Sequence, residues 1–122
     1  MNINLKKQTD QLWACLIDDI QHDYKTATML IRLKDPETEE FHTIKFEHVR
    51  TILWTMANVE GEINQNVFPE FTSIVLKNIK LKVKDKWLIN YSTRFNICIE
   101  IMDRALLINS SLIVVDGCSY EI

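Results

Sequence analysis

The sequence has only two glycines and two prolines among its 122 residues. So few glycines make a glycine-lined phosphate site implausible, and no dinucleotide fingerprint, phosphate loop or calcium loop is present. No apolar run approaches the roughly 20 residues that a membrane-spanning helix needs, and the first residues are too polar for a signal peptide. These absences argue against nucleotide-binding, membrane-spanning and exported classes of protein.

Cysteine is also scarce. The three cysteines, Cys15, Cys98 and Cys118, cannot all pair within one chain. Each lies in or near an apolar stretch, and no Cys-x-x-Cys pair suggests a metal or redox site. We therefore expect small buried thiols in a reducing compartment, and hence a cytoplasmic protein.

Charge of neither sign dominates. There are 14 Lys and Arg against 17 Asp and Glu, a formal net charge of -3, and 47% of the residues are hydrophobic. The composition is that of a folded globular protein, and the length suits a single domain over residues 1–122. A mild acidic excess argues against a general nucleic-acid binder.

Alternation of apolar and polar residues predicts most of the secondary structure. Residues 26–34 place Ala27, Met29, Ile31 and Leu33 on one face, as in a half-buried strand. A turn at 35–38, with Pro36 at its second position, returns the chain through 41–46, so residues 25–46 form a hairpin. Further strands are expected at 49–56, 71–77, 78–84, 94–102, 105–108 and 112–115, the last of them the final strand.

Two segments depart from this pattern. Thr9 and Asp10 predict a capped amphipathic helix over residues 10–17, with Trp13 on its inner side, although weak alternation lets a strand compete for its end. Residues 57–70 are predicted to form a long polar loop. The whole predicts a mainly β fold, an antiparallel sandwich or open barrel of about eight short strands with one short N-terminal helix.

Catalytic and metal-binding arrangements are missing from the sequence. His22 and Asp23 form the one adjacent histidine–carboxylate pair, but neighbours in a strand point to opposite faces, so a turn-forming role is favoured. His42 and His48 lack a metal-binding spacing and are read as solvated. We predict no enzyme activity, no catalytic or metal-ligating residue and no cofactor.

Lysines recur in the second half of the chain, at Lys77, Lys80, Lys82, Lys84 and Lys86, followed by Trp87, and Lys80, Lys82 and Lys84 would share one strand face. Such a stripe can bind single-stranded nucleic acid. It contains no arginine, however, and lysines also protect exposed edge strands from pairing with other chains. The second interpretation is favoured.

Acidic residues gather at two expected loops: Glu37, Glu39 and Glu40 in the hairpin turn, and Glu60 and Glu62 in the long loop. Loops are where solvated charge normally lies, but such clusters also suit a basic protein partner. Trp13, Trp54 and Trp87 are expected in the core or at its rim. Trp54 adjoins the long loop and is a candidate interface anchor.

One stretch carries a family resemblance. His22-Asp23 follows the first element, and Phe46-x-x-Val49 follows the hairpin. Over this third of the chain the sequence resembles small, mostly uncharacterised bacterial single-domain β-rich proteins, some of them immunity proteins encoded beside polymorphic toxins. The resemblance implies a cytoplasmic binder that neutralises a partner protein by covering its surface, and it transfers no catalytic residue.

The leading prediction is a non-enzymatic intracellular protein-interaction module, with an immunity-type inhibitor as its more specific form. Its partner would be another protein, not nucleic acid or a membrane, and a homodimer is compatible with it. The alternative is a small-molecule-binding β-barrel or an enzyme without a recognisable motif, because the aromatic and methionine side chains would line a cavity as readily as a core.

Overall fold

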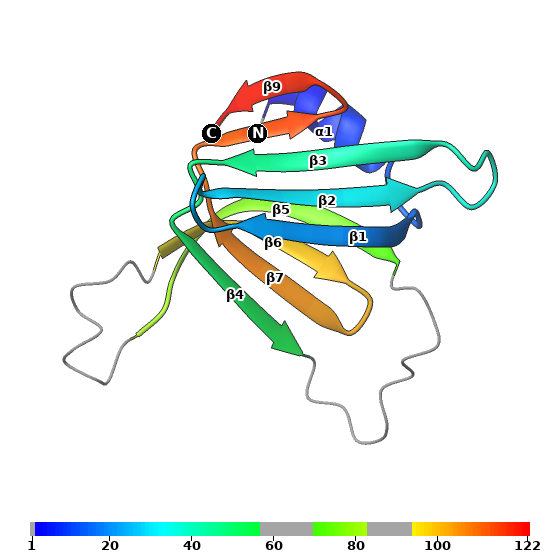
Figure 1. Ribbon diagram of the computed structural model, residues 1–122. Coiled ribbons are helices and arrows are strands. Elements are labelled where there is room, and N and C mark those ends of the chain that lie inside the picture. Colours follow the sequence, from blue (N-terminus) through cyan, green and yellow to red (C-terminus); the bar gives the residue numbers. More distant parts are fainter. Residues whose placement is uncertain (1, 57–69, 83–93) are drawn as a thin grey trace.

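The computed structural model describes residues 2–56, 70–82 and 94–122 (Figure 1). Among these residues, a short helix precedes nine strands. In chain order they are α1 (Ile3–Asp10), β1 (Leu16–Asp23), β2 (Thr28–Lys34), β3 (Phe41–Glu47), β4 (Thr51–Met56), β5 (Phe71–Lys80), β6 (Arg94–Ile101), β7 (Arg104–Asn109), β8 (Leu112–Val115) and β9 (Cys118–Glu121).

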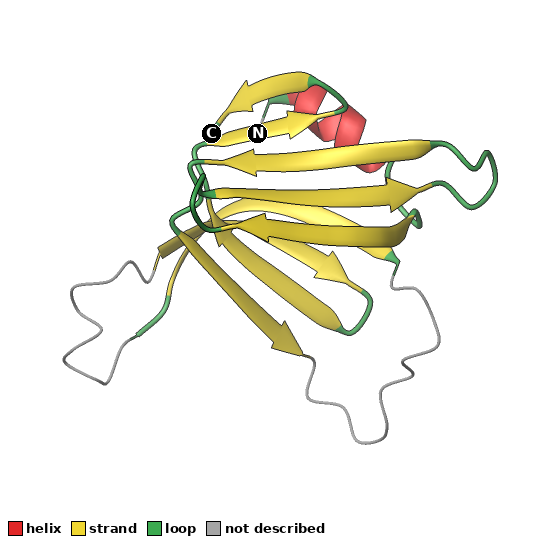
Figure 2. Cartoon of the chain, viewed as in Figure 1, coloured by secondary structure: helices red, strands yellow, loops and turns green. Residues whose placement is uncertain are grey.

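The strands form two antiparallel sheets that pack face to face (Figure 2). Sheet A has the order β1-β2-β3-β8-β9, and sheet B has the order β4-β7-β6-β5. Every pairing between these strands is antiparallel. The predicted mainly β class, with an antiparallel sandwich and one short N-terminal helix, is confirmed.

The core lies between the sheets, because alternate residues of each strand point inward. Ile31 and Phe46 of sheet A and Ile97 and Leu106 of sheet B are fully buried. Burying one such side chain contributes roughly 1.5–3 kcal/mol. Met29, Ile31 and Leu33 are all in this core, as the alternation in residues 26–34 predicts.

The helix closes one side of the sandwich. α1 contacts β8 of sheet A and β5 of sheet B, and Figure 1 shows it behind β8 and β9. Its Leu5 is fully buried, and Gln8 accepts a hydrogen bond from the Tyr120 hydroxyl of β9. This side of the sandwich is therefore covered by the chain itself.

The helix does not lie where the sequence pattern places it. It spans Ile3–Asp10 and is capped by Asn2, whose Oδ1 accepts from the Asn4 and Leu5 amides at 2.8 and 3.3 Å. The predicted helix over 10–17 is wrong: Leu16 begins β1, the strand that competed for this stretch. Trp13, placed on the inner side, is 69% exposed, because it lies in the turn between α1 and β1.

The chain ends in one strand more than predicted. β8 is followed by β9, and the two are joined by the two-residue turn Asp116-Gly117, with φ of 47° and 84°. Such a pair with positive φ at both residues matches the twist of a hairpin. The prediction that 112–115 is the final strand is therefore wrong.

The chain crosses from one sheet to the other after β3 and again after β7. Ser110 joins these two crossings through hydrogen bonds. This side chain is 1% exposed, and its hydroxyl donates to the carbonyl of Glu47 at 2.6 Å. The Ser110 amide donates to Asn96 Oδ1 at 3.1 Å, and Asn96 Nδ2 donates back to the Ser110 carbonyl at 2.7 Å. These bonds fix the end of β3 against the ends of β6 and β7.

The three cysteines are free, but they are not all buried. Cys15 is buried, Cys98 is half-buried and Cys118 is exposed at the start of β9. The expectation of a buried thiol is wrong for Cys118, because it lies on a short edge strand. In the part of the chain that the structure describes, no helix has the length and apolar character to cross a bilayer.

Candidate partner-binding surface

The acidic turn between β2 and β3 is held by its own hydrogen bonds. Asp35 Oδ1 accepts from the Glu37 amide at 2.8 Å and from the Thr38 amide at 3.3 Å. The backbone closes the same turn, since the Asp35 amide donates to the Glu40 carbonyl and the Glu39 amide donates to the Asp35 carbonyl, both at 2.9 Å. These hydrogen bonds hold the backbone of the turn in one conformation, so the positions from which its side chains project are fixed.

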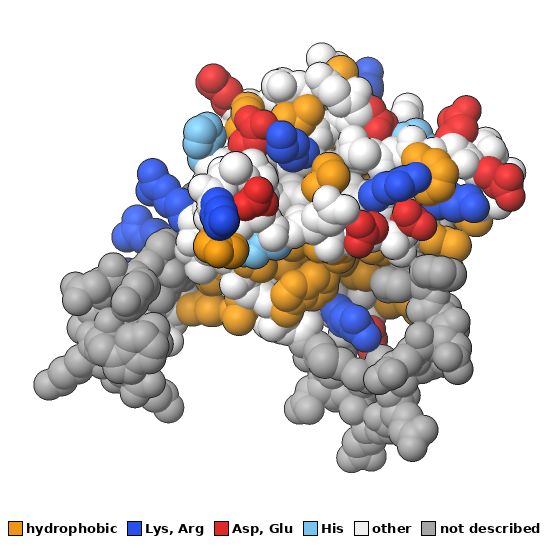
Figure 3. Space-filling model, viewed as in Figure 1, with side chains coloured by type: hydrophobic (Ala, Val, Ile, Leu, Met, Phe, Trp, Pro, Cys, Tyr) orange, Lys and Arg blue, Asp and Glu red, His pale blue; other side chains and the backbone are white. Residues whose placement is uncertain are grey.

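Three carboxylates project from this turn without a cation to neutralise them. Glu37, Glu39 and Glu40 are all exposed, and none of them makes an ion pair within residues 2–56, 70–82 and 94–122. Acidic side chains gather at the end of the molecule where this turn lies (Figure 3). The turn therefore carries unneutralised negative charge on an ordered backbone.

An exposed aromatic ring lies beside the acidic turn. Phe41, the first residue of β3, is 47% exposed. The Arg32 guanidinium lies 3.9 Å from the centre of this ring, and the Lys34 ammonium lies 5.8 Å from it. Both cations come from β2, where Lys34 is the residue paired with Phe41. The ring is thus held in place by cation–π contacts on the outer face of sheet A.

A small hollow of about 280 Å³ adjoins this ring and turn, lined by Leu16, Ile17, Asp18, Lys34, Pro36 and Glu39. Two carboxylates, one ammonium and an apolar floor give it a net negative lining. Asp18 also lies 3.5 Å from Arg32 Nε. We call Asp18, Arg32, Lys34, Glu37, Glu39, Glu40 and Phe41 the hairpin surface. Its chemistry suits a partner's lysine or arginine, with its alkyl chain on the apolar floor.

The structure separates the predicted binding residues. Glu37, Glu39 and Glu40 lie together on the turn of sheet A, whereas Trp54 lies on β4 of sheet B. Trp54 is 43% exposed and so lies at the core rim, as predicted. Glu60 and Glu62 fall outside the described residues, as does most of the predicted loop 57–70.

The sequence analysis missed Asp18, Arg32 and Phe41. The signal for Phe41 was present, because a turn at 35–38 sets a hairpin register with Phe41 opposite Lys34. Asp18 was not predictable in this way. It lies at an irregularity between Ile17 and Asp19 in the pairing of β1 with β2, which no local pattern encodes.

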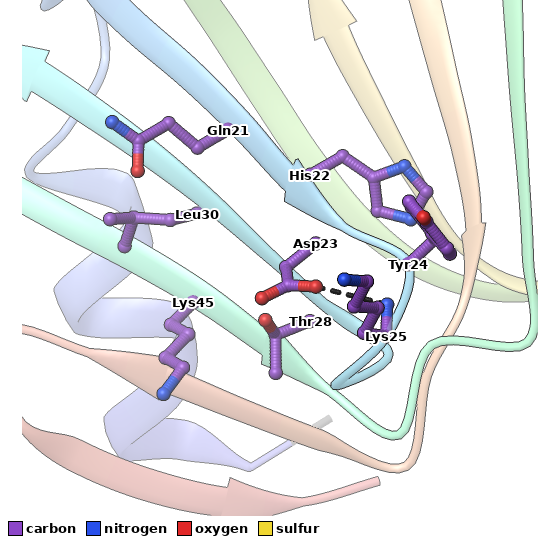
Figure 4. A pocket seen from close by; sticks show the side chains of 8 residues that line it. All are labelled: Gln21, His22, Asp23, Tyr24, Lys25, Thr28, Leu30 and Lys45. Carbon is purple, nitrogen blue, oxygen red and sulfur yellow. Dashed lines mark hydrogen bonds between the residues drawn. The ribbon is translucent and has the colours of Figure 1, made fainter.

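A second hollow, of about 650 Å³, surrounds the end of β1 (Figure 4). Figure 4 shows the His22 ring turned toward Tyr24 and away from Asp23. Asp23 Oδ1 instead accepts from the Lys25 amide at 2.9 Å and the Thr26 amide at 3.3 Å. These bonds, that from Thr26 first, hold the pKa of Asp23 below its ordinary value. Asp23 therefore forms the turn, as the sequence suggests, and makes no dyad with His22.

Within the described residues, the histidines and cysteines do not assemble into a metal site. His42 Nδ1 lies 2.8 Å from Asp116 Oδ2, His48 is exposed, and no group of three or more potential metal ligands lies within the described ranges. Lys77, Lys80 and Lys82 are exposed, with the first two on the edge strand β5, while Lys84, Lys86 and Trp87 lie outside the described residues.

Some of the aromatic and methionine side chains, the sequence argument for a ligand cavity, pack into the core. Met29, Phe46 and Phe71 are at most 2% exposed and belong to one hydrophobic cluster between the sheets. Others, such as Trp13 and Met102, are exposed.

Comparison with known families agrees with a small single-domain β-rich chain. The YxiG-like protein family matches residues 5–120, a range that begins within α1, includes β1 to β8 and ends within β9. The chain belongs to the YxiG-like family. No curated protein sequence matches it.

Proposed function

We propose that this YxiG-like domain is a non-enzymatic intracellular protein-interaction module that binds a basic region of a partner protein through the hairpin surface. The observation that carries the proposal is the set of three unneutralised carboxylates, Glu37, Glu39 and Glu40, on an ordered turn beside the exposed ring of Phe41. Exposed carboxylates favour a basic partner, and aromatic and arginine side chains are enriched in protein interfaces.

Order in the turn supports the proposal energetically. A loop that is disordered before binding loses conformational entropy when it docks, which weakens the complex. Here the Asp35 side chain and the two backbone hydrogen bonds across the turn already fix its shape. The carboxylates therefore meet a partner with little further ordering of the backbone.

An immunity-type inhibitor is the more specific form of this proposal. It is supported by the resemblance, at His22-Asp23 and Phe46-x-x-Val49, to small β-rich bacterial proteins, some of which are encoded beside toxins. Such an inhibitor acts by covering a surface of its target and needs no catalytic group of its own. A basic target, such as a protein that acts on nucleic acid, matches the charge of the hairpin surface.

The test is a pull-down from the lysate of the native organism, followed by titration of the purified partner against variants. The double variant Glu39→Lys/Glu40→Lys reverses two charges of the hairpin surface. The double variant Glu100→Lys/Glu121→Lys makes the same change of net charge at exposed positions on β6 and β9. We expect the first to weaken binding at least about tenfold and the second to weaken it less than about twofold.

Salt and Phe41 give two further readouts. Because the attraction is between exposed charges, the association rate should fall as ionic strength rises. Phe41→Ala should weaken binding by increasing the dissociation rate, because the ring makes contact only in the docked complex. A partner that binds both double variants equally well, or no stoichiometric partner at all, would contradict the proposal.

A further inference from the structure

Exposed cations gather at one end of sheet B, although they lie far apart in the sequence. Lys80, the last residue of β5, pairs in register with Arg94, which begins β6. Asn109 Nδ2 donates to the Arg94 carbonyl at 2.9 Å, and the Asn109 carbonyl accepts from the Arg50 amide at 2.9 Å. The fold therefore brings two arginines to the lysines of β5. We call the following exposed residues the basic end: Arg50, Lys77, Lys80, Lys82 and Arg94.

The basic end is not neutralised by ion pairs within residues 2–56, 70–82 and 94–122. Glu47, which ends β3 at the corner fixed by Ser110, is paired with Lys45 at 3.2 Å. Figure 1 places the end of β5 and the start of β6 on the left, opposite to the β2–β3 turn, and Figure 3 shows Lys and Arg side chains on that left side. The formal net charge of -3 is thus divided between an acidic end and a basic end, and it does not argue against local binding of an anion.

A hollow of about 300 Å³ lies within the basic end, lined by Asn78, Ile79, Lys80, Arg94 and Phe95. Ile79 and Phe95 pair in register and form its apolar part. The pairing of β5 with β6 is irregular between Leu76 and Ile79, which is where Asn78 lies, and such bulges redirect side chains beside binding sites. The hollow offers two cations, an amide and an apolar surface, at the lower limit of the roughly 300–1,000 Å³ of small-molecule sites.

We propose that the basic end binds single-stranded nucleic acid, with one base in the hollow and neighbouring phosphates on its lysines and arginines. Lysine and arginine neutralise phosphates regardless of base sequence. The base lies against Ile79 and Phe95, and the Asn78 amide can both donate to its edge and accept from it. A duplex keeps its bases stacked and paired, so only an unpaired strand offers a base to the hollow.

A nucleotide combines the two groups that this surface needs, a charged phosphate and a base with an apolar face. A segment of acidic protein would satisfy the cations, but its polar side chains would leave the apolar surface of Ile79 and Phe95 uncovered. The absence of arginine from the lysine stripe argues against nucleic acid in the sequence, but Arg94 lies opposite Lys80 in the fold. Arginine can bind phosphate oxygens through two parallel hydrogen bonds.

The test is fluorescence anisotropy with a labelled oligouridine of about twelve nucleotides, measured over a series of salt concentrations. The logarithm of the affinity should fall linearly with the logarithm of the salt concentration, with a slope of roughly -0.7 for each neutralised phosphate, or about -2 to -3.5 for roughly three to five contacts. A duplex of the same length and a poly-glutamate peptide should bind at least about tenfold more weakly. No binding of oligouridine at low salt, or equal binding of the duplex or the peptide, would overturn the proposal.

Charge-removing variants locate the site. Lys80→Gln/Arg94→Gln should weaken binding at least about tenfold and make the salt slope less steep by roughly 1.4. The matched control Lys6→Gln/Lys7→Gln removes the same charge from exposed positions on α1 and should weaken binding less than about twofold. Asn78→Ala should weaken binding without changing the slope, because it removes a contact to the base and none to phosphate. Circular dichroism establishes that the variants fold, and equal losses in the two double variants would overturn the proposal.

This site is independent of the protein-binding function proposed above, because the basic end belongs to sheet B and the hairpin surface to sheet A. Glu39→Lys/Glu40→Lys should lose the basic partner and retain oligouridine, whereas Lys80→Gln/Arg94→Gln should do the reverse. A protein that binds a basic partner but no oligouridine rejects the nucleic-acid site alone. One that binds oligouridine but no basic partner rejects the hairpin surface alone.

Discussion

Asp116 connects the turn between β8 and β9 to β3, and replacing it by alanine should destabilise the domain measurably. Its Oδ1 accepts from the Thr43 amide at 2.9 Å, and its Oδ2 lies 2.8 Å from His42 Nδ1. The residue also adopts the left-handed conformation, with φ of 47°, in the turn before Gly117. Asp116→Ala removes both side-chain contacts and places an unfavourable residue in that conformation.

The magnitude follows from three contributions. The hydrogen bond from Thr43 is worth about 1 kcal/mol. The contact with His42 is worth about 0.5 kcal/mol, because the Asp116 side chain is 38% exposed and water screens the pair. Alanine in the left-handed region adds about 1 kcal/mol. The free energy of unfolding should therefore fall by about 2–3 kcal/mol, which lowers Tm by roughly 10 °C for a domain of this size.

Urea unfolding followed by circular dichroism measures this change, with Asp116→Asn as the control. Asparagine tolerates the left-handed conformation and retains a carbonyl oxygen for the Thr43 amide. Its cost should be less than half of the cost of alanine. A loss below about 0.5 kcal/mol for Asp116→Ala would refute the reasoning. Equal losses for the two variants would show that the charge matters more than the turn geometry.

Two further predictions concern titratable groups. Burial raises the pKa of Cys15, as the carboxylates of Asp35 and Asp116 do to a lesser extent, and burial also raises the pKa of Cys98. A maleimide reagent at pH 7 should therefore label the exposed Cys118 first and Cys15 only when the protein unfolds. Mass spectrometry of samples taken over time measures the order of labelling. Rapid labelling of Cys15 in the folded protein would contradict its burial. The pKa of Asp23 is lowered, so its turn bonds stabilise the fold above the ordinary pKa of aspartate and this stability is lost as pH falls through the lowered value. A ¹³C NMR titration should place its midpoint below that of a model aspartate, and an unshifted midpoint would contradict the bonds from Thr26 and Lys25.

The β2–β3 hairpin was predictable because its signals are local. Alternation in residues 26–34, the Pro36 turn and the return strand all lie within about twenty positions, and the register follows from the turn. Glu37, Glu39 and Glu40 could therefore be placed together from sequence alone. The contact of Phe41 with Arg32 follows from the same register, so most residues of the hairpin surface could be predicted from the sequence.

The N-terminal segment was not predictable, because its apolar residues do not belong to one element. Leu12 and Cys15 are buried from a turn, with Ala14 in the left-handed conformation at φ 65°, and Ile17 is buried from β1. In the sequence, these apolar residues have the spacing expected for one face of a helix. The real helix is mostly polar and is fixed by its Asn2 cap and by packing against distant strands.

The last strand was missed for a different reason. Asp116-Gly117 is among the strongest short hairpin signals and was present in the sequence. Residues Cys118–Glu121, however, number only four, which is too few for a clear periodic pattern, and of these only Tyr120 is half-buried. A turn signal should therefore outweigh weak periodicity when the following segment is only four residues long.

The exposure of Trp54 depends on sheet order, which no local pattern contains. β4 is an edge strand because the chain crosses from sheet A to sheet B after β3 and then pairs with β7, more than fifty residues later. Ser110 fixes this crossing by joining the end of β3 to the start of β8. The sequence could mark Trp54 as a rim residue, but it could not predict the place of β4 in the order of sheet B.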